Sequence, residues 1–231
     1  MYEEPLHIPT ELDFAGDDPF CVGYQILGSC DGLFCISRDF VDLFLWNPST
    51  RKLKKLPPSG INVRPEEDNH FSYGFGYFES QSDYRDVEIL ESRNNYCYRN
   101  DVSVHSLRTY SWKTIQECPT VNFLDQAGKF VNGKIHWIVA YPDRVSDRNC
   151  TWYISSFDLA DETFGDVVLP DPNDDYLDIE IGSSGGILCF FSYSKIKTDV
   201  WVMKEYELAE SWTKVASISS KNYDAWPIFI S

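Results

Sequence analysis

The chain has 231 residues, of which 43% are hydrophobic and 16% aromatic. This composition excludes a disordered chain, and the length suits one all-β domain with a sizeable core. Its 20 basic and 36 acidic residues give a net charge of −16, which disfavours nucleic acid and anionic membranes as partners because both carry phosphate. A basic protein would be the natural partner of such an acidic surface. Alternatively, the negative charge serves only to keep the chain soluble.

Residues 1–20 carry six acidic side chains and no hydrophobic periodicity, so we expect an acidic N-terminal arm followed by one domain over residues 21–231. The arm has neither the basic nor the apolar region of a secretory signal. No segment approaches the ~18 apolar residues that span a bilayer. The seven cysteines are odd in number and form no CxxC pair, which indicates a reducing compartment. We therefore expect a soluble protein of the cytoplasm or nucleus, with Cys35 and Cys189 as free core thiols.

The first well-marked unit is LGSCDGLFCISRDFVDLFLWNPSTRKLKKLPP, residues 27–58. Short apolar strands are separated there by a turn that begins at Asn47, whose side chain can accept a hydrogen bond from the backbone ahead of it. Pro48 fixes φ at the next turn position. The pattern predicts antiparallel strands joined by tight connections.

Weaker copies of this unit follow along the chain. Glycine-led strands recur as GLFCI, GKIHWI and GILCFF, starting at residues 32, 133 and 186. Gly74 and Gly76 in a Tyr/Phe-rich strand predict either a close approach of backbones or a bulge. The spacing of apolar residues in residues 201–212 is compatible with a helix, but the matching positions of the other units favour a hairpin.

Together these signals predict sixteen strands in four units, each of four antiparallel strands. The unit spacing of roughly 45 to 60 residues is typical of propeller blades. We expect an all-β, propeller-like array that need not close into a ring, with residues 225–231 as the first strand of a fifth unit. The expected strands are residues 21–29, 32–37, 42–46 and 52–56; 71–79, 84–92, 101–107 and 111–116; 129–131, 134–141, 151–159 and 163–169; and 177–181, 186–192, 199–206 and 211–218.

No motif for catalysis, a cofactor or a metal stands out. None of the four histidines has a partner at metal-ligand spacing, and His136 alternates with apolar neighbours as a structural histidine would. GSSGG, residues 182–186, lacks the lysine of a phosphate-binding loop and predicts a turn between strands. Residues 171–182 alternate carboxylates but fail the EF-hand pattern, since its sixth position is Tyr176. The sequence leaves open whether the fold brings a cysteine and a histidine together as a nucleophile pair.

Seven fragments in order resemble the F-box-associated domain of plant F-box proteins. They are GSCDGLFCI, LWNPSTRKLKKLPP, YGFGY, VSVHSLRTYSWKTI, FVNGKIHWI, SFDLADETFGDVVLP and DVWVMKEYELAESWTKV, spread over residues 25–218. The resemblance implies a kelch-like propeller without catalytic residues. It also implies substrate recognition for a Skp–cullin–F-box ubiquitin ligase, which ubiquitinates the bound protein. Members usually carry an N-terminal F-box of about 40–50 residues that docks the Skp adaptor. Residues 1–20 are too short and too acidic to form one, so we expect Skp and cullin to be reached only through an F-box that this sequence does not contain.

We therefore expect a non-enzymatic protein-interaction module whose partner is a target protein. Because loops vary while strands must pack, the binding surface is expected on the loops of one face of the propeller. Two alternatives remain. One is a carbohydrate-binding or hydrolytic propeller, in which Tyr73, Phe75 and Trp137 would stack on a sugar, although core packing is the expected role of each. The other is a non-functional or dominant-negative fragment. The candidate binding loops are residues 62–70, 93–99, 141–150 and 171–176, while individual binding residues stay unassigned.

Overall fold

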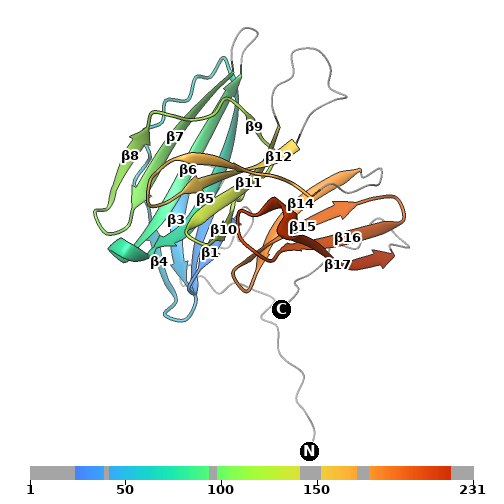
Figure 1. Ribbon diagram of the computed structural model, residues 1–231. Helices are drawn as coiled ribbons and strands as arrows, with labels where there is room; N and C mark the ends of the chain where they lie inside the picture. The colour runs from blue at the N-terminus through green and yellow to red at the C-terminus, as the bar shows by residue number, and fades with distance from the viewer. Residues whose placement is uncertain (1–23, 39–41, 94–97, 141–151, 171–176, 220–231) are drawn as a thin grey trace, which may run out of the picture.

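A computed structural model describes residues 24–38, 42–93, 98–140, 152–170 and 177–219. They fold into four antiparallel sheets that fan out as blades around a common centre (Figure 1). Strand order within each sheet follows the chain, so every blade is a simple meander from an inner to an outer strand. This confirms the predicted all-β array of four-stranded units. The expected arm, residues 1–20, and the expected extra strand, residues 225–231, lie outside the described residues.

The four blades contain all the described strands and two short 3-10 helices. Blade 1 contains β1 (Tyr24–Cys30), β2 (Leu33–Arg38), β3 (Asp42–Asn47) and β4 (Lys52–Lys55). Blade 2 contains β5 (Asp68–Phe78), η1 (Glu79–Gln81), β6 (Asp83–Arg93), β7 (Tyr98–Ser106) and β8 (Ser111–Ile115). Blade 3 contains β9 (Asn122–Phe123), β10 (Lys129–Val131), β11 (Lys134–Ala140), β12 (Trp152–Asp158) and β13 (Phe164–Val167). Blade 4 contains β14 (Asp178–Ser184), β15 (Ile187–Tyr193), β16 (Lys197–Met203), η2 (Ala209–Ser211) and β17 (Trp212–Ser219).

Several strand bounds differ from the expected ones, as at β5, which begins at Asp68, and β7, which begins at Tyr98. The short strand β9 pairs with β11 beside β10 and was not predicted. Residues 204–206, expected at the end of a strand, form the turn that leads into η2, so residues 201–212 do form the predicted hairpin with a short 3-10 insert. The glycines at 32 and 133 lie in the turn before each strand rather than in it.

These glycine turns share one geometry. Asp31 and Gly32 have φ of 49° and 78°, and Asn132 and Gly133 have φ of 52° and 80°. Two consecutive left-handed residues make a type I′ turn, whose twist matches the flanking strands and whose second position suits glycine. The strand after Gly32 therefore starts one residue later than predicted, at Leu33, and β15 likewise starts at Ile187, whereas β11 starts at Lys134 as predicted.

The core consists of three apolar clusters, one between each pair of successive blades. Phe75 of β5 lies in the cluster between blades 1 and 2, and Trp137 of β11 in the cluster between blades 2 and 3. Phe190 of β15 lies in the cluster between blades 3 and 4. Among the described residues no such cluster joins blade 4 to blade 1, so the four blades form an arc rather than a closed ring.

Close backbone approach holds blades 2 and 3 together near the centre. A Cβ atom at Gly74 would lie 2.6 Å from Ile135 Cγ2, which leaves room only for glycine. Tyr73 forms a parallel bridge with Ala127, and its backbone N–H donates to the Gln126 carbonyl at 2.8 Å. The register of β5 with β6 is continuous, so these glycines serve close approach and not a bulge.

The outer hairpins contact the preceding blade through residues with positive φ. Tyr110 (φ 54°) donates from its hydroxyl to the Lys55 carbonyl of blade 1 at 2.7 Å. Glu162 (φ 56°) accepts from Arg85 of blade 2 at 3.0 Å, and Glu207 (φ 63°) pairs with Lys134 of blade 3. The same position in blade 1 is Arg51, with φ of 53°. The repeat thus extends to the polar contacts between blades.

Strand direction gives the array two distinct ends. Turns between the first two and last two strands of each blade lie at one end, which we call the hairpin face. The other connections within and between blades lie at the opposite end, which we call the loop face. In Figure 1 the hairpin ends of blades 1 and 2 lie toward the bottom and their loop ends toward the top, whereas the strands of blade 4 run across the view. None of the helices in the described chain is long and apolar enough to cross a membrane.

Candidate interaction surface

The loop face carries the attachment points of all four predicted binding loops. Residues 62–67 form the end of the connection between β4 and β5, and residues 68–70 begin β5. Residues 93–99 join β6 to β7, and residues 94–97 among them lie outside the described residues. The other two loops, residues 141–150 between β11 and β12 and residues 171–176 between β13 and β14, also lie outside the described residues. The strand ends that flank these loops lie on one face of the array.

The two faces differ in regularity. The hairpin face repeats tight turns, among them the left-handed pairs at residues 31–32, 132–133 and 185–186. The loop face has connections of unequal length, as residues 56–67 between β4 and β5 and residues 194–196 between β15 and β16 illustrate. Irregular connections on a rigid frame are where binding residues concentrate.

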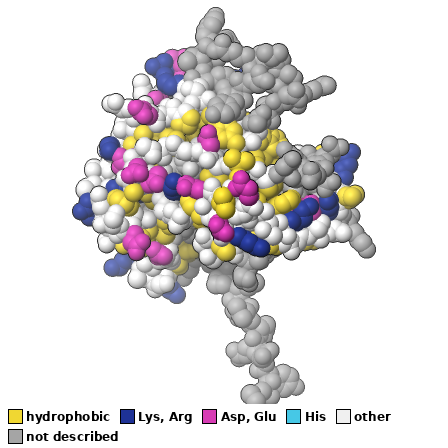
Figure 2. All heavy atoms as spheres, in the orientation of Figure 1, with side chains coloured by type: hydrophobic (Ala, Val, Ile, Leu, Met, Phe, Trp, Pro, Cys, Tyr) yellow, Lys and Arg dark blue, Asp and Glu magenta, His cyan; other side chains and the backbone are white. Residues whose placement is uncertain are grey.

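Charged side chains are interspersed on the surface seen in Figure 2, where acidic and basic groups lie among one another rather than in one patch. On this face the acidic side chains do not form a single patch. Such a distribution attracts a basic partner at long range, but specificity must come from particular sites.

The three aromatic residues proposed for sugar stacking are buried in the core. Tyr73 is 2% exposed, and Phe75 and Trp137 are 0% exposed. The Trp137 indole N–H donates to the Tyr73 carbonyl at 3.0 Å, inside the interface between blades 2 and 3. A sugar cannot reach these ring faces, so these side chains serve packing.

His136 is a structural histidine, as predicted. Its Nδ1 lies 3.1 Å from the Lys129 carbonyl and its Nε2 lies 2.7 Å from the Tyr206 hydroxyl of blade 4. Burial lowers the pKa of His136 to about 4. The neutral imidazole therefore joins blade 3 to blade 4.

One Cys–Asp–His cluster forms in the core, between blades 1 and 2. His105 Nδ1 lies 3.3 Å from Asp86 Oδ2, and the negative charge of the Asp86 carboxylate acts on the Cys35 thiol. All three side chains are buried, and burial raises the pKa of both Cys35 and Asp86. A protonated thiol without access to substrate cannot act as a nucleophile. The described residues contain no group of three or more His, Cys, Asp or Glu that could hold a metal ion.

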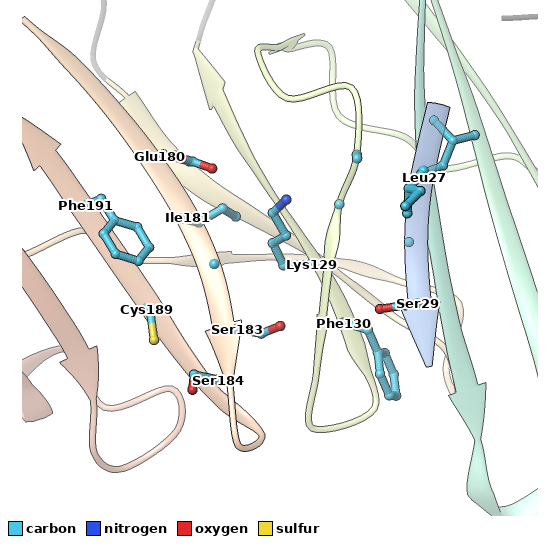
Figure 3. Close-up of a pocket in the computed structure, with 15 residues that line it drawn as sticks. Leu27, Ser29, Lys129, Phe130, Glu180, Ile181, Ser183, Ser184, Cys189 and Phe191 are labelled. Atoms are coloured by element: carbon cyan, nitrogen blue, oxygen red, sulfur yellow. The ribbon is translucent and has the colours of Figure 1, made fainter. Parts of the chain in front are cut away.

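A cavity of about 370 Å³ lies at the centre of the array, between β1, the residues leading into β10, and β14 with β15 (Figure 3). Its polar groups include Lys129, Glu180 and the hydroxyls of Ser29 and Ser183. Glu180 accepts a hydrogen bond from the Tyr193 hydroxyl at 2.8 Å. The nearby Cys189 thiol has a raised pKa because it is buried. The cavity offers polar contacts without an activated nucleophile.

A second cavity, of about 320 Å³, lies between blades 1 and 2 beneath the β4–β5 connection. Glu88 of β6 lines it and is 9% exposed. Ser59 donates from its hydroxyl to Glu88 Oε1 at 2.9 Å, and burial raises the pKa of Glu88 to about 6. Most of the wall is apolar, formed by Leu43, Leu56, Pro57, Ile61, Phe71 and Tyr73, and the ion pair of Asp42 and Lys55 also borders the pocket. We call this cavity the Glu88 pocket.

Sequence reasoning did not single out the Glu88 pocket. Glu88 lies in the alternating stretch RDVEILES, where Val87 and Ile89 face blade 3 and Glu88 faces blade 1. Its partner Ser59 lies in another blade, so spacing along the chain gave no signal. The available hint was a carboxylate in the middle of an apolar strand.

Comparison with known proteins identifies the family. The family model described as "F-box associated beta propeller domain" matches residues 9–229. The F-box/kelch-repeat protein At3g23880 of Arabidopsis thaliana is 30% identical over 216 residues, covering 90% of this chain and 56% of that protein. F-box protein CPR1 of Arabidopsis thaliana is also 30% identical, covering 84% of this chain and 52% of that protein. The chain thus spans about half the length of these relatives.

A solved structure supports the fold independently. The structure of YjhT aligns with a TM-score of 0.54 and 12% sequence identity, over 84% of this chain and 65% of that chain. At this identity the likeness concerns the fold alone. Together with the family match over residues 9–229, it leads to one conclusion: this chain belongs to the F-box-associated β-propeller domain family.

Proposed function

We propose that this chain is a non-catalytic recognition module that binds a target protein through its loop face. When it is joined to an F-box, the Skp–cullin ligase would ubiquitinate the bound protein. The observation that carries the proposal is the gathering of the irregular connections on one face, opposite a face of repeated tight turns. Membership of the F-box-associated family agrees with this role.

Electrostatics favour a basic target. With a net charge of −16, the chain attracts positively charged proteins over distances comparable with the Debye length, about 10 Å at 0.1 M salt. Association with such a target should therefore slow as salt is added. Binding that is unchanged between low and high salt would remove this electrostatic part of the proposal.

We also propose that the protein acts in the cytoplasm or nucleus, where thiols stay reduced. The described cysteines Cys30, Cys35, Cys118 and Cys189 are free thiols, in line with a reducing compartment. A fluorescent fusion in plant cells tests this placement, and a signal confined to the secretory pathway would contradict it.

Affinity capture from plant cells tests the recognition role. The chain is expressed alone and fused to an F-box, with matched charge reversals on the two faces. Glu66→Arg lies in the exposed β4–β5 connection on the loop face, and Asp161→Arg lies in an exposed turn on the hairpin face. We expect the same target in both captures, the Skp adaptor only with the F-box fusion, and loss of target with Glu66→Arg alone. Equal effects of the two reversals would contradict binding through the loop face.

A further inference from the structure

We infer that the Glu88 pocket binds a lysine side chain of the target protein, with the Glu88 carboxylate as the counter-ion of the ammonium group. The inference rests on the proposed function and names one anchor within it. The pocket belongs to the loop-face half of the interface between blades 1 and 2, because residues 56–63 of the β4–β5 connection form its roof.

Glu88 has no cation of its own. One carboxylate oxygen accepts the hydrogen bond from Ser59, and among the described residues the other oxygen accepts none. Lys55 borders the pocket, but its Nζ pairs with Asp42 Oδ2 at 2.7 Å and lies over the Phe44 ring, 5.9 Å from the centroid. Phe44 and Lys55 are paired residues on the face of blade 1 that points away from blade 2. The buried carboxylate of Glu88 thus faces the cavity with no cation paired to it among the described residues.

Anchoring of the β4–β5 connection does not account for this charge. Ser59 also accepts a hydrogen bond from the Ile61 N–H at 3.3 Å, so its hydroxyl fixes the loop while donating to Glu88. That bond needs only an acceptor oxygen, which a glutamine amide would provide without a buried charge. Burial of an unpaired carboxylate is costly. A function that needs the negative charge explains why it is there.

The walls suit the stem of a lysine. Leu43, Leu56, Ile61 and the Phe71 and Tyr73 rings can pack around methylene groups, while the ammonium reaches Glu88 at the base. The Phe71 and Tyr73 rings are stacked, with centroids 6.0 Å apart, and form one continuous wall. The volume of about 320 Å³ is at the lower end for ligand pockets, which suits a single side chain.

Lysine fits better than arginine for a geometric reason. Arginine pairs best with two free carboxylate oxygens in a forked arrangement. Ser59 already occupies Oε1 of Glu88. One free oxygen suits the compact ammonium of lysine.

A titration of the ¹⁵N-labelled full chain, followed by NMR, tests the pocket without the target. The probes are the N-acetyl methylamides of lysine, norleucine and arginine, of which norleucine is the uncharged analogue of lysine. We expect the lysine probe to shift the amide signals of Gly60, Ile61 and Val63, and norleucine to leave them unchanged. Glu88→Gln should weaken lysine binding at least about tenfold, since a hydrogen-bonded charge pair is lost.

Two further variants separate loss of the pocket from loss of the fold. Glu91→Gln is the matched control, because Glu91 is also 9% exposed on β6 but accepts from the Phe123 N–H in the next interface. It should bind the lysine probe like the parent chain. Val63→Lys changes a rim residue that is 46% exposed, so the fold is preserved. Its lysine should occupy the pocket and weaken binding of the free probe about tenfold, as a tethered competitor does.

The outcomes are distinct. Lysine binding that disappears with Glu88→Gln but survives Glu91→Gln supports the inference. Equal binding of norleucine would overturn the role of Glu88, and equal binding of arginine would overturn the choice of lysine. If no probe shifts these amides while the chain still captures a target through its loop face, the pocket assignment is wrong and the proposed function stands. Loss of target capture altogether would overturn the proposed function as well.

Discussion

Replacement of Glu88 by glutamine should stabilise the chain at neutral pH. The carboxyl group of Glu88 has a pKa of about 6 in the folded chain, raised from 4.5 because burial disfavours the charged form. The folded state therefore binds the proton more tightly than the unfolded state. The contribution of Glu88 to stability is fully present below pH 4.5 and is lost as the pH rises through 6.

The size of the effect follows from the pKa shift. A rise of the pKa from 4.5 to about 6 corresponds to about 2 kcal/mol at neutral pH. Glutamine carries no charge at any of these pH values and keeps an acceptor for the Ser59 hydroxyl. Glu88→Gln should therefore raise the free energy of unfolding by up to about 2 kcal/mol at pH 7.5, or the melting temperature by roughly 4–8 °C. At pH 4 the difference should vanish.

Urea unfolding of both chains at pH 7.5 and pH 4 measures the effect. Glu66→Gln, at an exposed position, is the control and should leave the free energy of unfolding unchanged at both pH values. Destabilisation by Glu88→Gln at pH 7.5 would contradict this prediction, because it would mean that the Glu88 charge stabilises the folded chain. A gain that is equally large at pH 4 would show that it does not come from ionisation.

Three contacts between blades should also be measurable by urea unfolding at pH 7.5. Arg85→Ala removes a guanidinium that joins blades 2 and 3, and should cost about 3 kcal/mol because buried partners are left unpaired; a loss below about 1 kcal/mol would contradict this. Tyr206→Phe removes the hydroxyl bound to a buried imidazole and should cost about 1–3 kcal/mol, whereas no change would show that the bond is dispensable. Gly74→Ala should cost about 1–3 kcal/mol because its Cβ would lie 2.6 Å from Ile135. Gly165→Ala is its control, since the nearest atom to its Cβ would lie 3.5 Å away, and equal losses would contradict the close approach.

Local signals predicted most of the fold because each blade repeats them. The turn at Asn47 shows this: its Oδ1 accepts from the Thr50 N–H at 3.0 Å, as the sequence indicated. The equivalent turn in blade 3 uses Asp158 Oδ1, which accepts from the Ala160 N–H at 2.8 Å. Short elements without such signals were missed. The strand β9 has two residues and depends on pairing with β11, which no local pattern encodes.

The candidate site was less predictable because it depends on contacts between blades. Core packing was the expected role of Tyr73 and is confirmed, but the neighbouring blade residues that bury it could not be identified from the sequence pattern. The Glu88 pocket brings together Ser59 and Glu88, which are far apart in the chain. Sequence reasoning could place the loops on the loop face through the alternation of strands. It could not find a pocket whose walls come from two blades.

Hydrogen exchange of the chain, with and without its captured target, tests recognition through the loop face. We expect protection in residues 56–67 and at the loop-face ends of the strands, and unchanged exchange in the turns at residues 31–32, 132–133 and 185–186. Protection confined to those turns, with the loop face unaffected, would contradict recognition through the loop face.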